Sequence, residues 1–284
     1  MNLNFNAVTG MGLDQVKKST QKFSESIAKI SSGKKLLSMG DDSAGYVKTL
    51  KLESSLRRIE STKGNIQDAL SYTQVSNSFI EEIIKTVNRM GEINRQAMDN
   101  RYDDKDKDAF SHEFNQLSAQ LMDIIGNGQE GNDPHGTYNE TDLFGPHSLV
   151  GRKLVTTDDE GVAPIEIPEI NFRAGDIVKI TGQKFDFSAG GDDLDALFST
   201  IKSAVDQVTQ ELAKMSGVEF RLKENLSGNA VIAQNIEAAF ARIRDTDIAA
   251  ESTHMAKYNI MARANMAVLA QANMQPQKIL DLLR

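Results

Sequence analysis

The sequence predicts a mainly α-helical protein: a long antiparallel coiled coil or helical bundle of the N- and C-terminal arms, with a small β-hairpin element in the middle of the chain. Both arms carry apolar residues at the alternating spacing of four and three that is typical of paired helices. Hydrophobic content is 39% and Trp is absent, which suits long helices buried along one stripe. The few prolines leave most of both arms uninterrupted: Pro134, Pro146, Pro164, Pro168 and Pro276.

Two helices separated by a glycine stop are predicted at the start of the chain. Residues 13–30 form a short amphipathic helix whose apolar face contains Leu13, Val16, Phe23, Ile27 and Ile30. Gly33 follows this helix and suits the left-handed conformation that ends helices. Asp41 and Asp42 are candidate N-caps of a second helix. This helix is predicted to reach about residue 100, a length of about 85–90 Å.

Two long apolar seams predict how the arms pair. From Leu52 to Val87 the heptad stepping is apolar at eight of eleven positions, and from Leu194 to Ile243 at thirteen of fifteen. Two stripes of similar length are most simply buried against each other. The residues predicted to form this intramolecular seam are Leu56, Ile59, Ile66, Ile80, Ile84, Leu212, Leu222, Ile236 and Phe240.

The C-terminal arm, predicted over about residues 192–243, contains two irregularities. Glu219 lies on the heptad stepping but is charged, so it is expected to face solvent at a local slip in register. Its replacement by Ala is then expected to matter little. A break in the helix is expected near Ser216 and Gly217.

The middle of the chain differs from both arms. Residues 104–125 predict a third helix that packs back on the second. Residues 126–191 hold eleven of the twenty glycines. Within them, clusters of β-forming residues between turn signals predict a β-rich element at 153–157, 165–172 and 176–187.

Residues 251–284 are rich in Ala and Met and carry apolar residues on more than one helical face. A helix of this kind needs neighbours on several sides, more than a monomer supplies. No apolar run is long enough to span a bilayer, so membrane insertion is not expected. The charge pattern also argues against a nucleic-acid partner, because residues 99–195 hold eight Lys and Arg against twenty-one Asp and Glu.

No motif in the sequence predicts an enzyme, a cofactor or a metal site. Residues 126–131 match G-x-G-x-x-G, but a helix precedes them where the dinucleotide motif needs a strand. His112 and Glu113 begin a zinc-protease pattern, yet Gln116 stands where the second His belongs. The acidic run 103–108 lacks the glycine and terminal Glu of a calcium loop. We therefore expect a non-enzyme without a cofactor.

Three motifs carry a specific resemblance to the flagellins. SSGKKLLSMGDDSAG (31–45) resembles the family's S-S-G-x-R-I-N-x-A-x-D-D-A-A-G, and IRDTDIAAES (243–252) is similar to I-E-D-A-D-x-A-x-E. MAVLAQANMQPQKILDLLR (266–284) resembles the closing A-M-L-A-Q-A-N-Q-x-P-Q-x-V-L-x-L-L. All three occur in the family's order and at the right ends of the chain. The short middle resembles a near-minimal flagellin.

The resemblance implies a structural subunit that polymerises into the extracellular flagellar filament for motility. It also implies export in the unfolded state through the flagellar type III channel. Implied partners are other copies of the chain, the flagellar cap and hook-junction proteins, and an export chaperone at the C-terminal segment. The alternative within this class is a hook–filament junction protein, which resembles flagellin at its ends.

The resemblance also divides the chain into parts. Residues 1–40 and 251–284 are expected to be terminal helices of an inner polymerisation domain, and residues 41–250 a helical bundle domain. Arg89 and Glu92 match the segment that an innate immune receptor reads in the family, but Gly91 and Ile93 depart from it, so bare helix surface is expected there. The residues expected at the polymerisation interface are Phe23, Ile27, Ile30, Met266, Leu269, Leu280 and Leu283.

Overall fold

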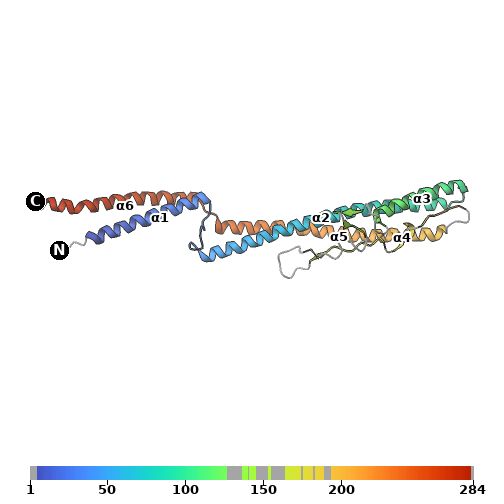
Figure 1. The fold of residues 1–284 in the computed structure, drawn as a ribbon, viewed down its shortest axis with the longest axis horizontal. Coiled ribbons are helices and arrows are strands. Elements are labelled where there is room, and N and C mark those ends of the chain that lie inside the picture. The colour runs from blue at the N-terminus through green and yellow to red at the C-terminus, as the bar shows by residue number, and fades with distance from the viewer. Residues whose placement is uncertain are drawn as a thin grey trace. The chain divides into compact units, whose positions relative to one another are not determined.

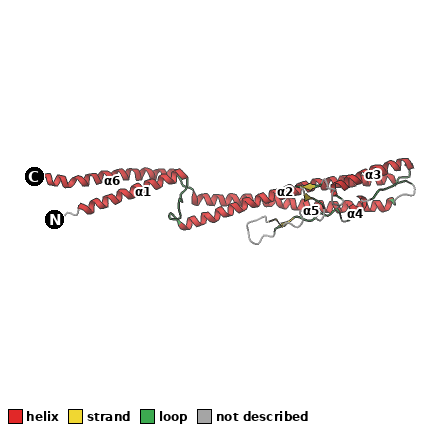
Figure 2. Cartoon of the chain, viewed as in Figure 1, coloured by secondary structure: helices red, strands yellow, loops and turns green. Residues whose placement is uncertain are grey.

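A computed structural model gives the fold, with residues 5–126, 136–139, 141–144, 153–154, 164–173, 175–181, 183–188 and 193–282 described. The mainly α-helical prediction is confirmed (Figure 2). The long helices are α1 (Phe5–Ser32), α2 (Ser43–Ala97), α3 (Asp104–Ile125), α5 (Leu194–Arg244) and α6 (Ile248–Leu282). The short elements are β1 (Thr137–Tyr138), β2 (Thr141–Asp142), β3 (Lys153–Leu154), β4 (Ile165–Glu166) and α4 (Asp176–Thr181).

The chain divides into two compact units. Unit 1 consists of Met1–Arg57 and Ala233–Arg284, and unit 2 of Arg58–Ile232. Both terminal helices, α1 and α6, belong to unit 1. Unit 2 contains α3, α4 and the four short strands, and α2 and α5 contribute residues to both units.

In unit 1, α1 and α6 lie side by side and run antiparallel (Figure 1). Leu269 contacts the start of α1, where a Cβ atom at Gly12 would lie 3.0 Å from its Cδ1 atom. Further along, the Asn265 amide donates to the Ser19 hydroxyl at 3.3 Å, and the Lys22 amine lies 5.5 Å from the centre of the Tyr258 ring. The glycine at position 12 therefore permits a close approach of the two helices.

The two connections of unit 1 pair with each other. Gly33 ends α1 with φ of 69°, in the left-handed region, as its position in the sequence predicted. Its carbonyl accepts from the Thr246 amide at 2.9 Å, and the Lys35 amide donates to the Arg244 carbonyl at 2.6 Å. The predicted cap at Asp42 is also confirmed, since its Oδ1 atom accepts from the Gly45 amide at 3.0 Å.

Unit 2 contains the main hydrophobic core. Its buried side chains come from α2, α3, α4, α5 and the segments between α3 and α5. Phe114 on α3 packs edge-on against Phe185 and Phe187, at ring separations of 5.0 and 5.2 Å. Of the buried apolar side chains in the described part of the chain, only Phe240 and Ala262 belong to unit 1. Unit 1 therefore has little core of its own.

Among the described residues, the β content is smaller than the sequence predicted, and residues 155–157 of the predicted segment 153–157 lie outside them. β1 pairs antiparallel with β2, and β3 with β4, each over two residues. The prediction of β structure over 176–187 is wrong at its start, because residues 176–181 form the helix α4. Ile177 and Ile180, three residues apart, are both buried on one face of this turn, and the Lys179 amine pairs with Asp176 at 2.6 Å.

Residues 183–187 of that segment form neither a helix nor a strand and have no strand partner among the described residues. Phe185 and Phe187 are buried and alternate with the exposed Lys184 and Asp186. Side chains of α3 replace the missing strand. Asn115 donates to the Phe185 carbonyl and accepts from its amide, both at 2.9 Å, and the Ser111 hydroxyl accepts from the Phe187 amide at 2.8 Å.

The expected break in the C-terminal arm is absent. α5 is continuous through Ser216 and Gly217. A Cβ atom at Gly217 would meet no heavy atom within 4 Å, so the glycine is not required by a close contact. Its neighbours Met215 and Val218 are both buried, and their packing holds the helix together across the glycine.

Candidate functional site

Exposed apolar side chains gather in unit 1. In the described part of the chain, twelve of the seventeen large exposed apolar residues belong to it. Ile260 is 69% exposed and Val268 is 64% exposed, although both lie in the middle of a helix. The remaining ten are Met11, Leu13, Ile27, Leu37, Met39, Val47, Leu50, Ile248, Met266 and Met274.

On α6 these side chains point in several directions. At about 100° of rotation per residue, Met266 and Val268 project about 160° apart. Both are more than half exposed, even though α6 already packs along α1. One neighbouring helix cannot cover both directions. The exposure of these side chains therefore agrees with the prediction that this helix carries apolar residues on several faces.

The residues expected at the polymerisation interface differ in their exposure within a single chain. Ile27 and Met266 are exposed, at 42% and 51%. Phe23, Ile30 and Leu269 are half-buried, and Leu269 contacts Gly12 of the same chain. The Leu280 side chain and residue Leu283 lie outside the described part of the structure. Ile260 and Val268 are exposed as well but were not among the interface residues expected from the sequence, although their position on a helix that is apolar on several faces indicates them.

The nine seam residues fall into two groups. Five are buried: Ile59, Ile66, Ile80, Leu222 and Phe240. The other four are half-buried: Leu56, Ile84, Leu212 and Ile236.

The C-terminal part of α2 buries a second face that the heptad stepping missed. Ile83, Met90 and Ile93 are fully buried although none of them lies on the stepping. They belong to the core cluster that also contains Phe114 and Leu121 of α3. A single seam cannot describe a helix that packs against α5 and is also covered by α3. The apolar residues of α3 in the sequence were the available signal for this second contact.

The expectation that Glu219 faces solvent is wrong. Its side chain is only 18% exposed, and its Oε2 atom accepts from the Asn77 amide of α2 at 2.6 Å. Its Oε1 atom pairs with the Lys223 amine one turn along α5 at 2.7 Å. Lys223 and then Asn77 lower the pKa of the Glu219 carboxyl below its ordinary value, against the opposing effect of burial. Asn77 lies on the heptad stepping of α2, as Glu219 lies on that of α5. The contact therefore joins a polar position of one seam to a polar position of the other.

Arg89 and Glu92 lie on the surface of α2 and are not free side chains. Arg89 donates to Glu113 of α3 at 2.6 Å and to Glu92 at 3.1 Å. Glu113 and then Glu92 raise the pKa of the Arg89 guanidinium. Glu113, which in sequence resembled the start of a zinc-binding pattern, therefore serves in an ion pair between helices. The described residues contain no group of side chains that could hold a metal ion.

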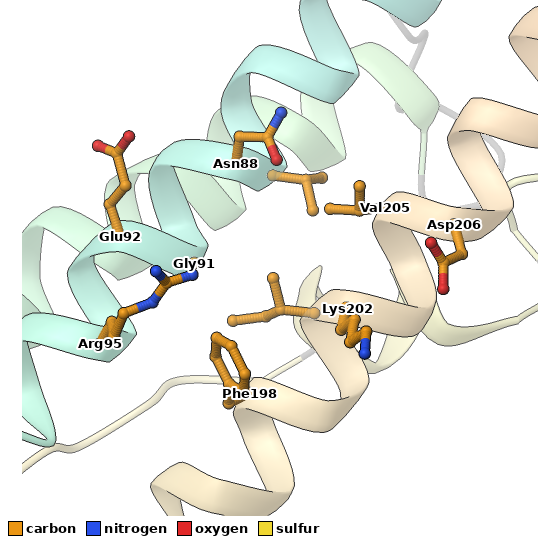
Figure 3. A pocket seen from close by; sticks show the side chains of 10 residues that line it. Asn88, Gly91, Glu92, Arg95, Phe198, Lys202, Val205 and Asp206 are labelled. Atoms are coloured by element: carbon orange, nitrogen blue, oxygen red, sulfur yellow. The ribbon is translucent and has the colours of Figure 1, made fainter.

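A groove of about 630 Å³ lies between α2 and α5 in unit 2. Figure 3 shows Gly91 and Arg95 on α2 opposite Phe198 and Lys202 on α5. The Arg95 guanidinium lies 5.3 Å from the centre of the Phe198 ring. Charged side chains of both signs line the groove, so its lining favours neither an anionic nor a cationic ligand.

None of the described helices is long and apolar enough to cross a membrane.

Comparison with known proteins matches both arms. Residues 3–133 match the bacterial flagellin N-terminal helical region, and residues 198–283 match the C-terminal helical region. Flagellin of Bacillus subtilis (strain 168) is 29% identical over 307 residues, covering 100% of both chains. The flagellar filament 31.3 kDa core protein of Treponema maltophilum is 28% identical over 271 residues, covering 90% of each chain. Flagellin of Halalkalibacterium halodurans is 27% identical over 286 residues, covering 97% of this chain and 94% of that one.

The two matched regions contain α1, α2 and α3 at one end of the chain and nearly all of α5 and α6 at the other. They also contain the three motifs that resemble flagellin, apart from the last residue of the third motif, Arg284. Family members of this kind are structural proteins of the flagellar filament. With both family regions present in order and relatives aligned along the whole chain, the protein belongs to the bacterial flagellin family.

Proposed function

We propose that this chain polymerises with copies of itself into a flagellar filament through the apolar faces that α1 and α6 leave exposed. The observation that carries the proposal is the exposure of Ile260, Met266 and Val268, which project in three directions around α6. Burying such side chains contributes about 1.5–3 kcal/mol each. A helical lattice repeats the same contacts for every subunit, so modest contributions accumulate into a stable polymer.

The proposal assigns residues 1–40 and 251–284 to the polymerisation domain and residues 41–250 to a bundle that supports it. Leu280 and Leu283 belong to the proposed surface together with the exposed residues of α6. Leu269 has a double role in this scheme, because it also contacts Gly12 on the neighbouring helix of its own chain. Phe23 and Ile30 are half-buried in the single chain and are proposed to be buried further on assembly. The proposal has no catalytic step.

We also infer that the chain leaves the cell unfolded through the flagellar type III channel and functions outside it. Its proposed partners are the cap and hook-junction proteins and an export chaperone that holds the C-terminal segment. The support for a chaperone is physical: the apolar side chains of α6 stay exposed until assembly and favour association with any apolar surface.

Substitution of Val268 by Asp tests the polymerisation surface. An unpaired carboxylate would be desolvated in the interface, so this variant is expected to form no filaments. Val268→Leu keeps the apolar character and is the matched control that should assemble. Circular dichroism of both variants should match the wild type. Filaments from Val268→Asp at the wild-type concentration would contradict the proposal.

Electron microscopy of the assembled protein separates the filament subunit from the alternative. A filament subunit forms polymers of unlimited length because each added copy recreates the binding surface. A hook–filament junction protein would instead give short assemblies of fixed length. Long filaments from the purified chain alone are the expected result.

A further inference from the structure

We propose that Met11, Met266 and Met274 form an oxidation-sensitive site, at which conversion of the thioethers to sulfoxides prevents free subunits from assembling. Assembly in turn shields the same thioethers from oxidants. The inference rests on the proposed function, because it takes the exposed faces of α1 and α6 as the polymerisation surface.

The methionines are distributed unequally between the two units. The side chains of Met11, Met266 and Met274 are 75%, 51% and 51% exposed, and all three lie on the paired helices of unit 1. In unit 2, Met90 and Met215 are fully buried in the core. Of the methionine side chains that the structure describes, the only other exposed one is Met39, 57% exposed in the connection between α1 and α2.

Thioethers are the only sulfur groups that an oxidant meets on this chain. The sequence has eleven Met and no Cys, so neither thiol oxidation nor disulfide exchange competes for an oxidant. The oxidant is a peroxide. A lone pair of the Met sulfur attacks one peroxide oxygen, the O–O bond breaks and an S–O bond forms. The sulfur loses two electrons, and hydrogen peroxide is reduced to one molecule of water.

The product changes the surface at the places where the proposed contact needs apolar atoms. A sulfoxide is a polar, chiral group with a strong hydrogen-bond acceptor, whereas the thioether is flexible and apolar. Burying that acceptor without a partner opposes association. Oxidation of an exposed side chain leaves the fold of the free subunit intact, because no core contact is lost. The effect therefore falls on assembly and spares folding.

The test begins with purified wild-type subunits, exposed to hydrogen peroxide or left untreated. Peptide mass spectrometry should show oxygen added at Met11, Met266 and Met274 but not at Met90 or Met215. Sedimentation should then show the concentration needed for filament formation raised at least tenfold. Treatment with methionine sulfoxide reductases for both epimers should restore assembly. In preassembled filaments the three thioethers should oxidise at least tenfold more slowly.

Two variants identify the responsible sulfurs. The triple variant Met11→Leu, Met266→Leu, Met274→Leu keeps the side-chain volumes nearly constant and should assemble equally well before and after peroxide. It still carries Met39, which should gain oxygen and thereby shows that the reagent acted. The matched variant Met39→Leu retains the other three thioethers and should stay sensitive.

Two results would overturn the inference while leaving the proposed function intact: unchanged assembly of subunits oxidised at all three sites, or continued sensitivity of the triple variant. Failure of untreated wild-type subunits to assemble would overturn both. If the triple variant does not assemble even without peroxide, Met→Gln substitutions introduce a polar group of similar size. Met266→Gln should impair assembly and Val178→Gln, at an exposed apolar position of unit 2, should not, and the reverse order would reject the site.

Discussion

Asn77 and Glu219 show how two single residues can fix the alignment of long helices. Each is one of the few polar residues in a largely apolar stepping, and the two meet at 2.6 Å across 142 residues of sequence. Shifting one helix by a turn would separate the Glu219 carboxylate from the Asn77 amide that donates to it. A buried polar contact of this kind sets the register of paired helices at some cost in stability.

Replacing Glu219 by Ala is expected to destabilise the protein, in contrast to the prediction from sequence. The change removes the acceptor of Asn77, whose Oδ1 atom already has no hydrogen-bond partner among the described residues. The cost should be about 1–3 kcal/mol, measured by urea unfolding. Glu224→Ala, at an exposed site on the same helix, is the control and should change the free energy of unfolding little.

The same carboxylate predicts a pH dependence of stability. The pKa of Glu219 is lowered from its ordinary value of 4.5, so the folded state binds its proton less readily than the unfolded state. Its contribution to stability is therefore complete above pH 4.5 and is lost as the pH falls through the lower folded-state pKa. Glu219→Gln should weaken the acid dependence in this range, as measured by thermal unfolding between pH 6 and pH 3. Identical acid dependence in both proteins would reject this assignment.

Asn94 offers a stabilising substitution. Its side chain is fully buried on α2, and neither its Nδ2 nor its Oδ1 atom has a hydrogen-bond partner among the described residues. Leu is of similar size and removes both unsatisfied groups, so Asn94→Leu should raise the free energy of unfolding by about 1–3 kcal/mol. Gln96→Leu, at an exposed position of the same helix, should give no comparable gain in chemical denaturation.

At the scale of elements, α2 distinguishes two isoleucines that its sequence pattern treats alike. Ile80 is fully buried and Ile84, one turn later, is half-buried. Ile80→Ala should cost about 2–5 kcal/mol, because a fully buried side chain leaves a cavity. Ile84→Ala is the matched control and should cost clearly less. Equal costs in equilibrium unfolding would show that the two sites are equally packed.

Periodicity in the sequence predicted the long helices well. Seams of apolar residues identified α2 and α5, and an amphipathic pattern with an acidic start identified α3, because these signals are local to each helix. Gly33 and Asp42 marked helix boundaries for the same reason: the preferences for left-handed conformation and N-capping act within a few residues.

The errors came from contacts between segments that are distant in the chain. Ile177 and Ile180 occur in a run of β-forming residues, yet α3 offers them a buried surface and a helical turn reaches it. From the sequence alone, Glu219 is expected to be a surface charge, because its partner Asn77 is distant in the chain. The candidate assembly surface was predicted in outline, but which side chains stay exposed depends on where α1 covers α6, and no local pattern determines that.

At the scale of the whole molecule, the two units should differ in stability. Nearly all buried apolar side chains of the described residues lie in unit 2. Most of the large apolar side chains that are exposed lie in unit 1. Calorimetry of the monomer should therefore show a weak transition for unit 1 at lower temperature than the transition for unit 2. Trypsin should cut first in unit 1, at Lys29, Lys34, Lys257 or Arg263. Early cleavage within 58–98 would contradict this.

Deletion of residues 266–284 applies the same division to assembly. The truncated chain should keep the unfolding transition of unit 2, because none of the removed residues belongs to that unit. It should form no filaments, since the deletion removes Val268 and the C-terminal part of the proposed surface. Sedimentation and calorimetry of one sample measure both properties. Loss of the unit 2 transition would show that the units fold as one.

The pairing of α1 with α6 also determines when unit 1 can fold. Asn265 and Ser19 touch across 246 residues, so the first helix to leave the ribosome finds its partner only when the last one has been made. Contacts between residues so far apart in the sequence are slow to form, because a large loop must close before any of them is made. The topology thus leaves the two terminal helices unpaired until the end of synthesis, a state that suits the proposed export through a narrow channel.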